Sequence, residues 1–314
     1  MSGVAEHSEC GGCGVSLHGR WCHDCGRDNR PPARSARDLL EDLLDNVFSF
    51  TAALPMTAKA LALRPSLTPR AQRDGDRTHF LSPVKLYVTA TLIFFLFLGL
   101  TGVSVFQVAV VRTGEGAPVV TGGDVPRIDN FRLEERWLHP ARAAPRDPEV
   151  VAAFDRAAST YPDEVTAAYM GFVRRIADDP SSVNDAIATW APRALWLMMP
   201  LHALLLWPLF RRGRYLADHL ILSLWAHTIV FLALIAGALW NFTGLGWGLA
   251  VALGLYQVYF TAGLRGYYGV SWRAAILKGS VHSFAYIGLL WLPLTAAFFI
   301  AQAMSGLPAS YWET

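Results

Sequence analysis

The feature that most constrains this chain is a series of long apolar runs, the first of which extends from Leu86 to Val111 without a charged residue. About 20 apolar residues are enough for a helix to cross the hydrocarbon core of a bilayer. Further runs of comparable character cover residues 194–210, 216–240, 245–264 and 280–304. We therefore expect an all-α integral membrane protein with about five transmembrane helices, which together form a membrane domain of residues 83–314.

The composition also fits a chain that lies largely in lipid. Charged residues make up 17% and hydrophobic residues 53% of the 314 residues. A soluble domain carries about 25% charged residues. These values exclude a disordered chain, a collagen-like chain and a disulfide-dense secreted domain.

The distribution of basic residues predicts how the chain is threaded through the membrane. The connections at residues 211–215 and 265–279 contain Arg or Lys, whereas residues 241–244 and 305–314 contain neither. Positively charged short loops stay on the cytoplasmic side. The amino terminus is therefore expected in the cytoplasm and the carboxy terminus outside it.

In this topology the long connection of residues 112–193 is an extracytoplasmic loop. Pro148 and Pro162 are each followed by acidic residues. Proline in the first turn and acidic residues at the positive end of the helix dipole are typical of helix starts. The loop is therefore expected to be helical, with helices near 148–159 and 162–178.

The cysteines lie close together near the start of the chain. All four belong to two CxxC pairs, Cys10 with Cys13 and Cys22 with Cys25. Four thiolates suit a closed tetrahedral Zn²⁺ site, which leaves no open position for catalysis. A redox role would need a thioredoxin-like context, which the sequence lacks. We expect residues 1–32 to form a zinc ribbon with structural Zn²⁺.

Residues after the ribbon add a second motif, with Arg64-Pro65 followed by Pro83-Val84-Lys85-Leu86-Tyr87. The ribbon and this motif together resemble an uncharacterised bacterial membrane family, catalogued as a domain of unknown function. In that family a CxxCG…CxxCG ribbon precedes an RP…R…G.R…P.KLY pattern that leads into the first span. The resemblance covers residues 10–95, with Ser66 where glycine would be expected. It implies a multi-pass protein of the bacterial inner membrane and brings no activity with it.

Residues 33–82 are expected to form a cytoplasmic amphipathic helix and a juxtamembrane segment. Leucines from Leu39 to Leu44 recur at helical spacing, and the opposite face is acidic. This helix is expected to pack on the protein itself, with docking to a partner as the alternative. Basic residues of the segment are candidates for binding lipid headgroups, with simple topology anchoring as the alternative: Arg64, Arg70, Arg77 and Lys85.

Ionisable residues inside membrane spans are functional candidates. The histidines could bind a transition metal or relay protons, and the alternative is neutral histidines that hydrogen-bond between helices. Asp218 lies near Arg212 and Arg214, with which we expect an ion pair at the inner border. The candidate intramembrane polar residues are His202, His219, His227 and His282.

Small residues repeat every fourth position at Gly246, Ala250 and Gly254. Such a row permits close helix approach. We expect it to pack either within the bundle or in a homo-oligomer formed through the span of residues 245–264.

The first functional interpretation is a membrane-anchored assembly, docking or regulatory factor whose ribbon binds a cytosolic protein. The alternative is a transporter or permease for a small solute, ion or lipid, and a third is an intramembrane enzyme. Enzyme action is the less favoured class, because the chain has no Walker A loop, GxGxxG, HExxH or GxSxG motif. Membrane lipid is an expected partner, and nucleic acid is not.

Overall fold

The computed structural model describes residues 9–10, 13–19, 22–24, 53–74, 80–113, 120–121, 127–128, 130–141, 146–160 and 164–304. The chain divides into two compact units, Met1–Thr51 and Ala52–Thr314. The first contains a cysteine cluster, and the second, which we call the membrane unit, is mostly helical. The expected amphipathic helix around Leu39–Leu44 and the residue Arg77 lie outside the described residues.

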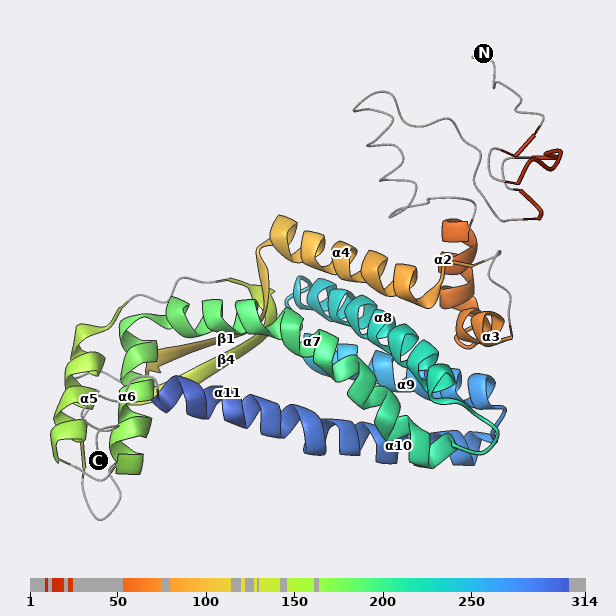
Figure 1. Ribbon diagram of the computed structural model, residues 1–314. Helices are drawn as coiled ribbons and strands as arrows, with labels where there is room; N and C mark the ends of the chain where they lie inside the picture. Colours follow the sequence, from red (N-terminus) through yellow and green to blue (C-terminus); the bar gives the residue numbers. More distant parts are fainter. Residues whose placement is uncertain are drawn as a thin grey trace. The chain divides into compact units, whose positions relative to one another are not determined.

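The membrane unit contains four apolar helical segments of membrane-crossing length: Pro83–Thr101, Arg193–Phe210, Leu216–Asn241 and Trp272–Gln302. They identify the chain as a membrane protein and agree with four of the five expected spans. The fifth, residues 245–264, falls on a helix that is not apolar enough to join them, because it carries Gln257 and Arg265. Besides α5 and α6, which are described below, the helices of the unit are α2 (Ala53–Leu63), α3 (Leu67–Arg73), α4 (Pro83–Thr101), α7 (Pro180–Phe210), α8 (Leu216–Asn241), α9 (Gly248–Tyr268), α10 (Trp272–Tyr286), the π-helix η1 (Ile287–Trp291) and α11 (Leu292–Met304) (Figure 1).

The first apolar run is helical only in its first part. Helix α4 starts where the Ser82 side chain accepts a hydrogen bond from the Lys85 amide, and it ends at Thr101. Gly102 follows with φ +65°, a conformation that glycine adopts without strain and that terminates helices. Strand β1, Val103–Arg112, continues the run. The expected span of 86–111 is therefore too long at its end.

Strand β1 belongs to a long hairpin that the sequence did not predict. It pairs antiparallel with β4, Phe131–Pro140. A second, short pair is formed by β2, Val120–Thr121, and β3, Arg127–Ile128. The fold is therefore not purely α-helical. Pairs of valines two residues apart in β1, Val103 with Val105 and Val108 with Val110, favour a pleated strand.

The helices expected in the long loop are confirmed as α5, Pro148–Thr160, and α6, Glu164–Asp178. They pack through a buried core that includes Phe154 and Val173. Arg112 at the end of β1 forms an ion pair with Asp147 at 2.7 Å. This guanidinium, aided by the Val150 amide, holds the pKa of the Asp147 carboxyl below its usual range. The expectation of a helical loop was thus right for α5 and α6, and it did not include strand β4 of the hairpin.

The hairpin meets one end of the helix bundle, which we call the hairpin end. Asn241 at the end of α8 donates hydrogen bonds to the carbonyls of Trp137 and Leu138 in β4, at 3.0 and 2.9 Å. Its side-chain oxygen accepts from the Gly248 amide at the start of α9, at 2.8 Å. One buried amide therefore joins α8, α9 and β4.

The opposite end, which we call the basic end, holds the α7–α8 connection, the end of α9 and the start of α10. Arg73 of α3 donates a hydrogen bond to the Tyr267 carbonyl near the end of α9. Lys278 of α10 donates to the Leu209 carbonyl near the end of α7, at 2.7 Å. From there α10, η1 and α11 continue as one helical run toward α6, where Phe299 contacts Phe172 with ring centroids 5.8 Å apart (Figure 1).

The small-residue row does not pack inside the membrane unit. Gly246 precedes α9 with φ +70°, and Gly254 has no atom within 4 Å of a Cβ built on it. The close approach of α8 and α9 uses Gly237 and Gly248 instead. A Cβ on Gly237 would lie 2.3 Å from the Gly248 carbonyl oxygen, and a Cβ on Gly248 would lie 2.2 Å from the Gly237 carbonyl oxygen. The row at Gly254 therefore faces away from the bundle.

Candidate functional site

The cysteine cluster of the first unit brings three of the four expected ligands together. The sulfur atoms of Cys10, Cys13 and Cys22 all lie within 4.8 Å of one another, and Cys13 Sγ is 3.4 Å from Cys22 Sγ. A tight turn arranges them, in which the Gly14 amide donates to the Cys10 carbonyl at 2.9 Å. Tetrahedral zinc with bonds of about 2.3 Å needs sulfur atoms about 3.8 Å apart. The three thiols could thus hold a metal ion, and Cys25 lies outside the described residues.

The membrane unit brings together three of the four candidate histidines. His202 comes from α7, His227 from α8 and His282 from α10, and each is at most 3% exposed. The ring centroid of His202 lies 4.3 Å from that of His282 and 5.2 Å from that of His227. We call these three residues, together with Tyr286, the histidine cluster.

The hydrogen bonds of the cluster distinguish its members. His227 Nδ1 donates to the Ser223 carbonyl at 2.8 Å, so Nε2 of the neutral ring accepts from the Tyr286 hydroxyl at 3.0 Å. His282 Nε2 donates to the His202 carbonyl at 3.2 Å. Neither ring nitrogen of His202 has a hydrogen-bond partner among the described residues, although the side chain is 0% exposed. Buried polar atoms are normally paired. His282 Nδ1, and outside the cluster His219 Nε2, Trp225 Nε1 and the Tyr259 hydroxyl, also lack a partner among the described residues. Within the cluster, His202 is the histidine that lacks a partner at both ring nitrogens.

Tyr286 is the member of the cluster that the sequence analysis missed. Its ring centroid lies 4.9 Å from that of His202, nearly perpendicular to it, and 6.0 Å from that of His282. Tyr286 follows His282 by four residues, so the two share one helix face. It also stands immediately before η1. Single π-helical turns of this kind occur often at functional sites.

His219 does not belong to the cluster. It lies toward the basic end, where Nδ1 is 2.6 Å from the Tyr268 hydroxyl. The Tyr268 ring in turn stacks on Phe210, with centroids 4.0 Å apart and planes 7° apart. The fourth candidate histidine thus has a separate environment.

The geometry disfavours a metal in the histidine cluster. Within the described ranges, the cysteines form the one group of three ligand residues whose donor atoms lie within 4.8 Å of one another. The three imidazoles therefore do not converge on one ion. Of the two chemical roles considered for them, proton exchange fits the arrangement better.

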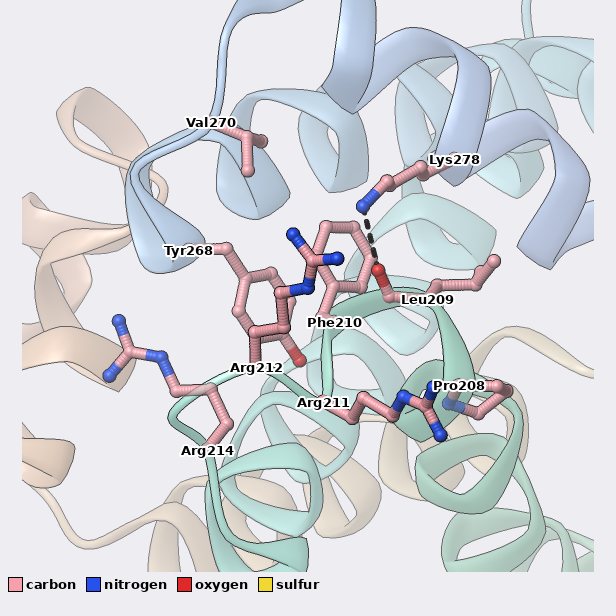
Figure 2. Close-up of a pocket in the computed structure, with 9 residues that line it drawn as sticks. All are labelled: Pro208, Leu209, Phe210, Arg211, Arg212, Arg214, Tyr268, Val270 and Lys278. Carbon is pink, nitrogen blue, oxygen red and sulfur yellow. Dashed lines mark hydrogen bonds between the residues drawn. The ribbon is translucent and has the colours of Figure 1, made fainter.

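The basic end differs from expectation in two ways. Asp218 does not pair with an arginine in the part of the chain that the structure describes; its carboxylate instead accepts from the Tyr215 amide at 3.0 Å and caps α8. Of the expected headgroup ligands, Arg64 and Arg70 are exposed and Lys85 is half-buried. None of the three lines the described pocket at this end, which four other basic residues line (Figure 2): Arg211, Arg212, Arg214 and Lys278.

Comparison with known proteins gives no match to any family model, curated protein or solved structure.

Proposed function

We propose that the membrane unit is a transporter that moves protons through its interior, with the histidine cluster as the protonatable site. One observation carries the proposal: His202 is fully buried and keeps both ring nitrogens free of hydrogen bonds among the described residues. Histidine is the side chain whose unperturbed titration lies nearest neutral pH. An imidazole without fixed partners has both ring nitrogens available for proton exchange.

The structural alternative accounts for His227 better than for His202. His227 joins α8 to α10 through the Tyr286 hydroxyl, as a neutral histidine packed between helices does. His202 makes no such link. A buried donor or acceptor without a partner costs about 1–3 kcal/mol. A buried histidine that lowers the free energy of unfolding is better explained by a role in proton exchange than by a role in helix packing.

The neighbours of the cluster support a path toward the basic end. Lys278 and His282 are four residues apart on one face of α10, about 6 Å along the helix. Lys278 lines the pocket of the basic end. A proton on the cluster would thus lie one helical turn from a water-accessible cavity.

We further propose five crossings, with α9 as the fifth. Helix α9 starts beside Asn241 at the hairpin end and finishes beside Arg73 at the basic end, so it connects the same two levels as α8. Five crossings place the termini on opposite sides. The basic end would face the cytoplasm, with the amino terminus, and the carboxy terminus would lie outside.

For the first unit we propose structural Zn²⁺, held by Cys10, Cys13, Cys22 and Cys25. The short sulfur–sulfur distances among the first three support this ligand set. When bound, the ion supplies folding energy rather than catalysis, because four thiolates close its coordination sphere.

Proton movement is tested in liposomes that contain the purified full chain and a trapped pH-sensitive dye. A potassium diffusion potential set with valinomycin drives protons inward. We expect wild-type liposomes to acidify faster than protein-free ones. His202→Leu should lower the protein-dependent rate by about 100-fold, the usual scale of one proton-transfer group.

His219→Gln is the matched control, because it removes another buried histidine of the same unit that lies outside the cluster. It is expected to keep the wild-type rate. Acidification no faster than in protein-free liposomes would contradict the proposal. So would a wild-type rate in His202→Leu, or an equal loss in the control.

A second candidate is the docking factor, and the division of the chain at Thr51 favours it, since the cysteine cluster belongs to a compact unit of its own. The test is cross-linking in native membranes of the full chain and of a version that lacks residues 1–32. A cytosolic protein captured only by the full chain would support docking. Identical partners for two folded proteins would exclude it.

A further inference from the structure

The basic end contains a cavity of about 570 Å³ at the point where α7 ends and α8 begins (Figure 2). Arg211, Arg212 and Arg214 come from the connection between these helices, and Lys278 comes from α10. The stacked rings of Phe210 and Tyr268 form an apolar part of the wall. A cavity of this size can hold a small polar group.

The charges of this cavity are not neutralised within the described part of the chain. No carboxylate lines it, and none forms an ion pair with the three arginine side chains there. Asp218, the nearest acidic residue in sequence, uses its carboxylate to cap α8 instead. Lys278 donates one hydrogen bond to the Leu209 carbonyl. The arginine guanidinium groups therefore keep their donors available for a ligand.

We infer that this cavity is a binding site for a phosphate group. Arginine guanidinium groups match phosphate oxygens with paired, charge-assisted hydrogen bonds. The cavity lies at the end of the apolar segment Arg193–Phe210, the level at which a lipid carries its phosphate. Exposed Trp207 and Trp272, residues of the kind enriched at membrane borders, lie close to it in sequence. The site takes either a phospholipid headgroup or free phosphate, and it does not depend on proton movement.

From the sequence, these arginines were expected to be topology signals, with Arg212 and Arg214 also paired to Asp218. A topology signal and a binding site make different predictions. A topology signal needs charge in the loop and no pocket. A binding site needs the particular arginines that line the cavity. The discriminating comparison is therefore between equal losses of charge inside and outside the cavity.

The test uses the full chain in nanodiscs of phosphatidylcholine, with phosphatidylglycerol added as one probe and inorganic phosphate as the other. Native mass spectrometry counts retained lipid, and radiolabelled phosphate measures the soluble ion. We expect Arg212→Gln with Arg214→Gln to weaken binding of the recognised probe by about tenfold for each arginine. Arg265→Gln with Arg273→Gln is the matched control, since both side chains are exposed and outside the cavity.

The outcomes separate the two sources of phosphate. Loss of phosphatidylglycerol from the cavity variant alone assigns the site to lipid, and loss of phosphate binding alone assigns it to the free ion. Equal weakening in both double variants, or no binding of either probe to the wild type, would overturn the inference. Should the double variant misfold, Arg211→Gln replaces it, because that exposed side chain has no partner among the described residues.

Discussion

Replacing Gly248 with alanine is expected to separate α8 from α9 and to destabilise the membrane unit by about 3 kcal/mol or more. A Cβ at this position would lie 2.2 Å from the Gly237 carbonyl oxygen and 2.5 Å from the Asn241 side chain. Backbone cannot move aside as a flexible side chain can, so the helices must shift. The shift would also break the bonds by which Asn241 holds β4. Thermal unfolding of the purified protein in detergent measures the loss.

Gly254→Ala is the matched control on the same helix. A Cβ there meets no atom within 4 Å, and the glycine has no positive φ. Alanine should therefore stabilise the helix by up to about 1 kcal/mol. Equal stability of the two variants would contradict the close packing of α8 on α9.

Replacing Cys22 with serine is expected to abolish zinc binding. The Cys22 sulfur is buried and lies 3.4 Å from Cys13 Sγ, so its loss removes a ligand from the centre of the cluster. Zinc contributes roughly 10–16 kcal/mol to folding in small finger peptides. Elemental analysis of the full chain should show about one zinc per wild-type molecule and less than a tenth of that in the variant.

The control for the zinc site is the double change of His18 and His23 to alanine. Both side chains are exposed, and their rings stack with centroids 5.8 Å apart. They lie beside the cysteines without being needed as ligands, so this variant should keep its zinc. Zinc retained in Cys22→Ser, or lost in the histidine variant, would contradict the cysteine ligand set.

Much of the helical framework could be predicted because it depends on local signals. Proline and acidic residues marked the start of α5, and apolar length marked α8 and the part of α7 from Arg193 onward. The earlier part of α7, which begins at Pro180, was not predicted. The end of the first span could not be predicted in this way. Hydropathy does not distinguish a buried helix from a strand, and the apolar run continues from α4 through Gly102 into the valines of β1. The valines favour a strand, but its hydrogen-bond partner β4 is distant in sequence, and hydropathy does not reveal that pairing.

The candidate sites were likewise predictable where they depend on local sequence and not where they depend on packing. The spacing of the cysteines predicted a cluster, and three of them lie together. Their position inside apolar spans made His202, His227 and His282 candidate site residues. The same criterion also chose His219, which lies apart from the cluster. Which histidines meet depends on the rotation of each helix about its axis, and that rotation follows from packing. The cavity of the basic end was missed because it forms only where the α7–α8 connection meets Tyr268, Val270 and Lys278, which are distant in sequence.

The central claim is that His202 is kept for proton exchange and not for packing. The most direct measurement compares the thermal unfolding of His202→Leu and His227→Leu with that of the wild type. His202→Leu should be at least as stable as the wild type, because it leaves no described partner unpaired. His227→Leu should lose about 1–3 kcal/mol, because the Tyr286 hydroxyl loses its acceptor. The Ser223 carbonyl keeps its helical hydrogen bond from the amide of residue 227. A loss of stability in His202→Leu as large as that in His227→Leu would contradict the claim and make His202 a structural residue.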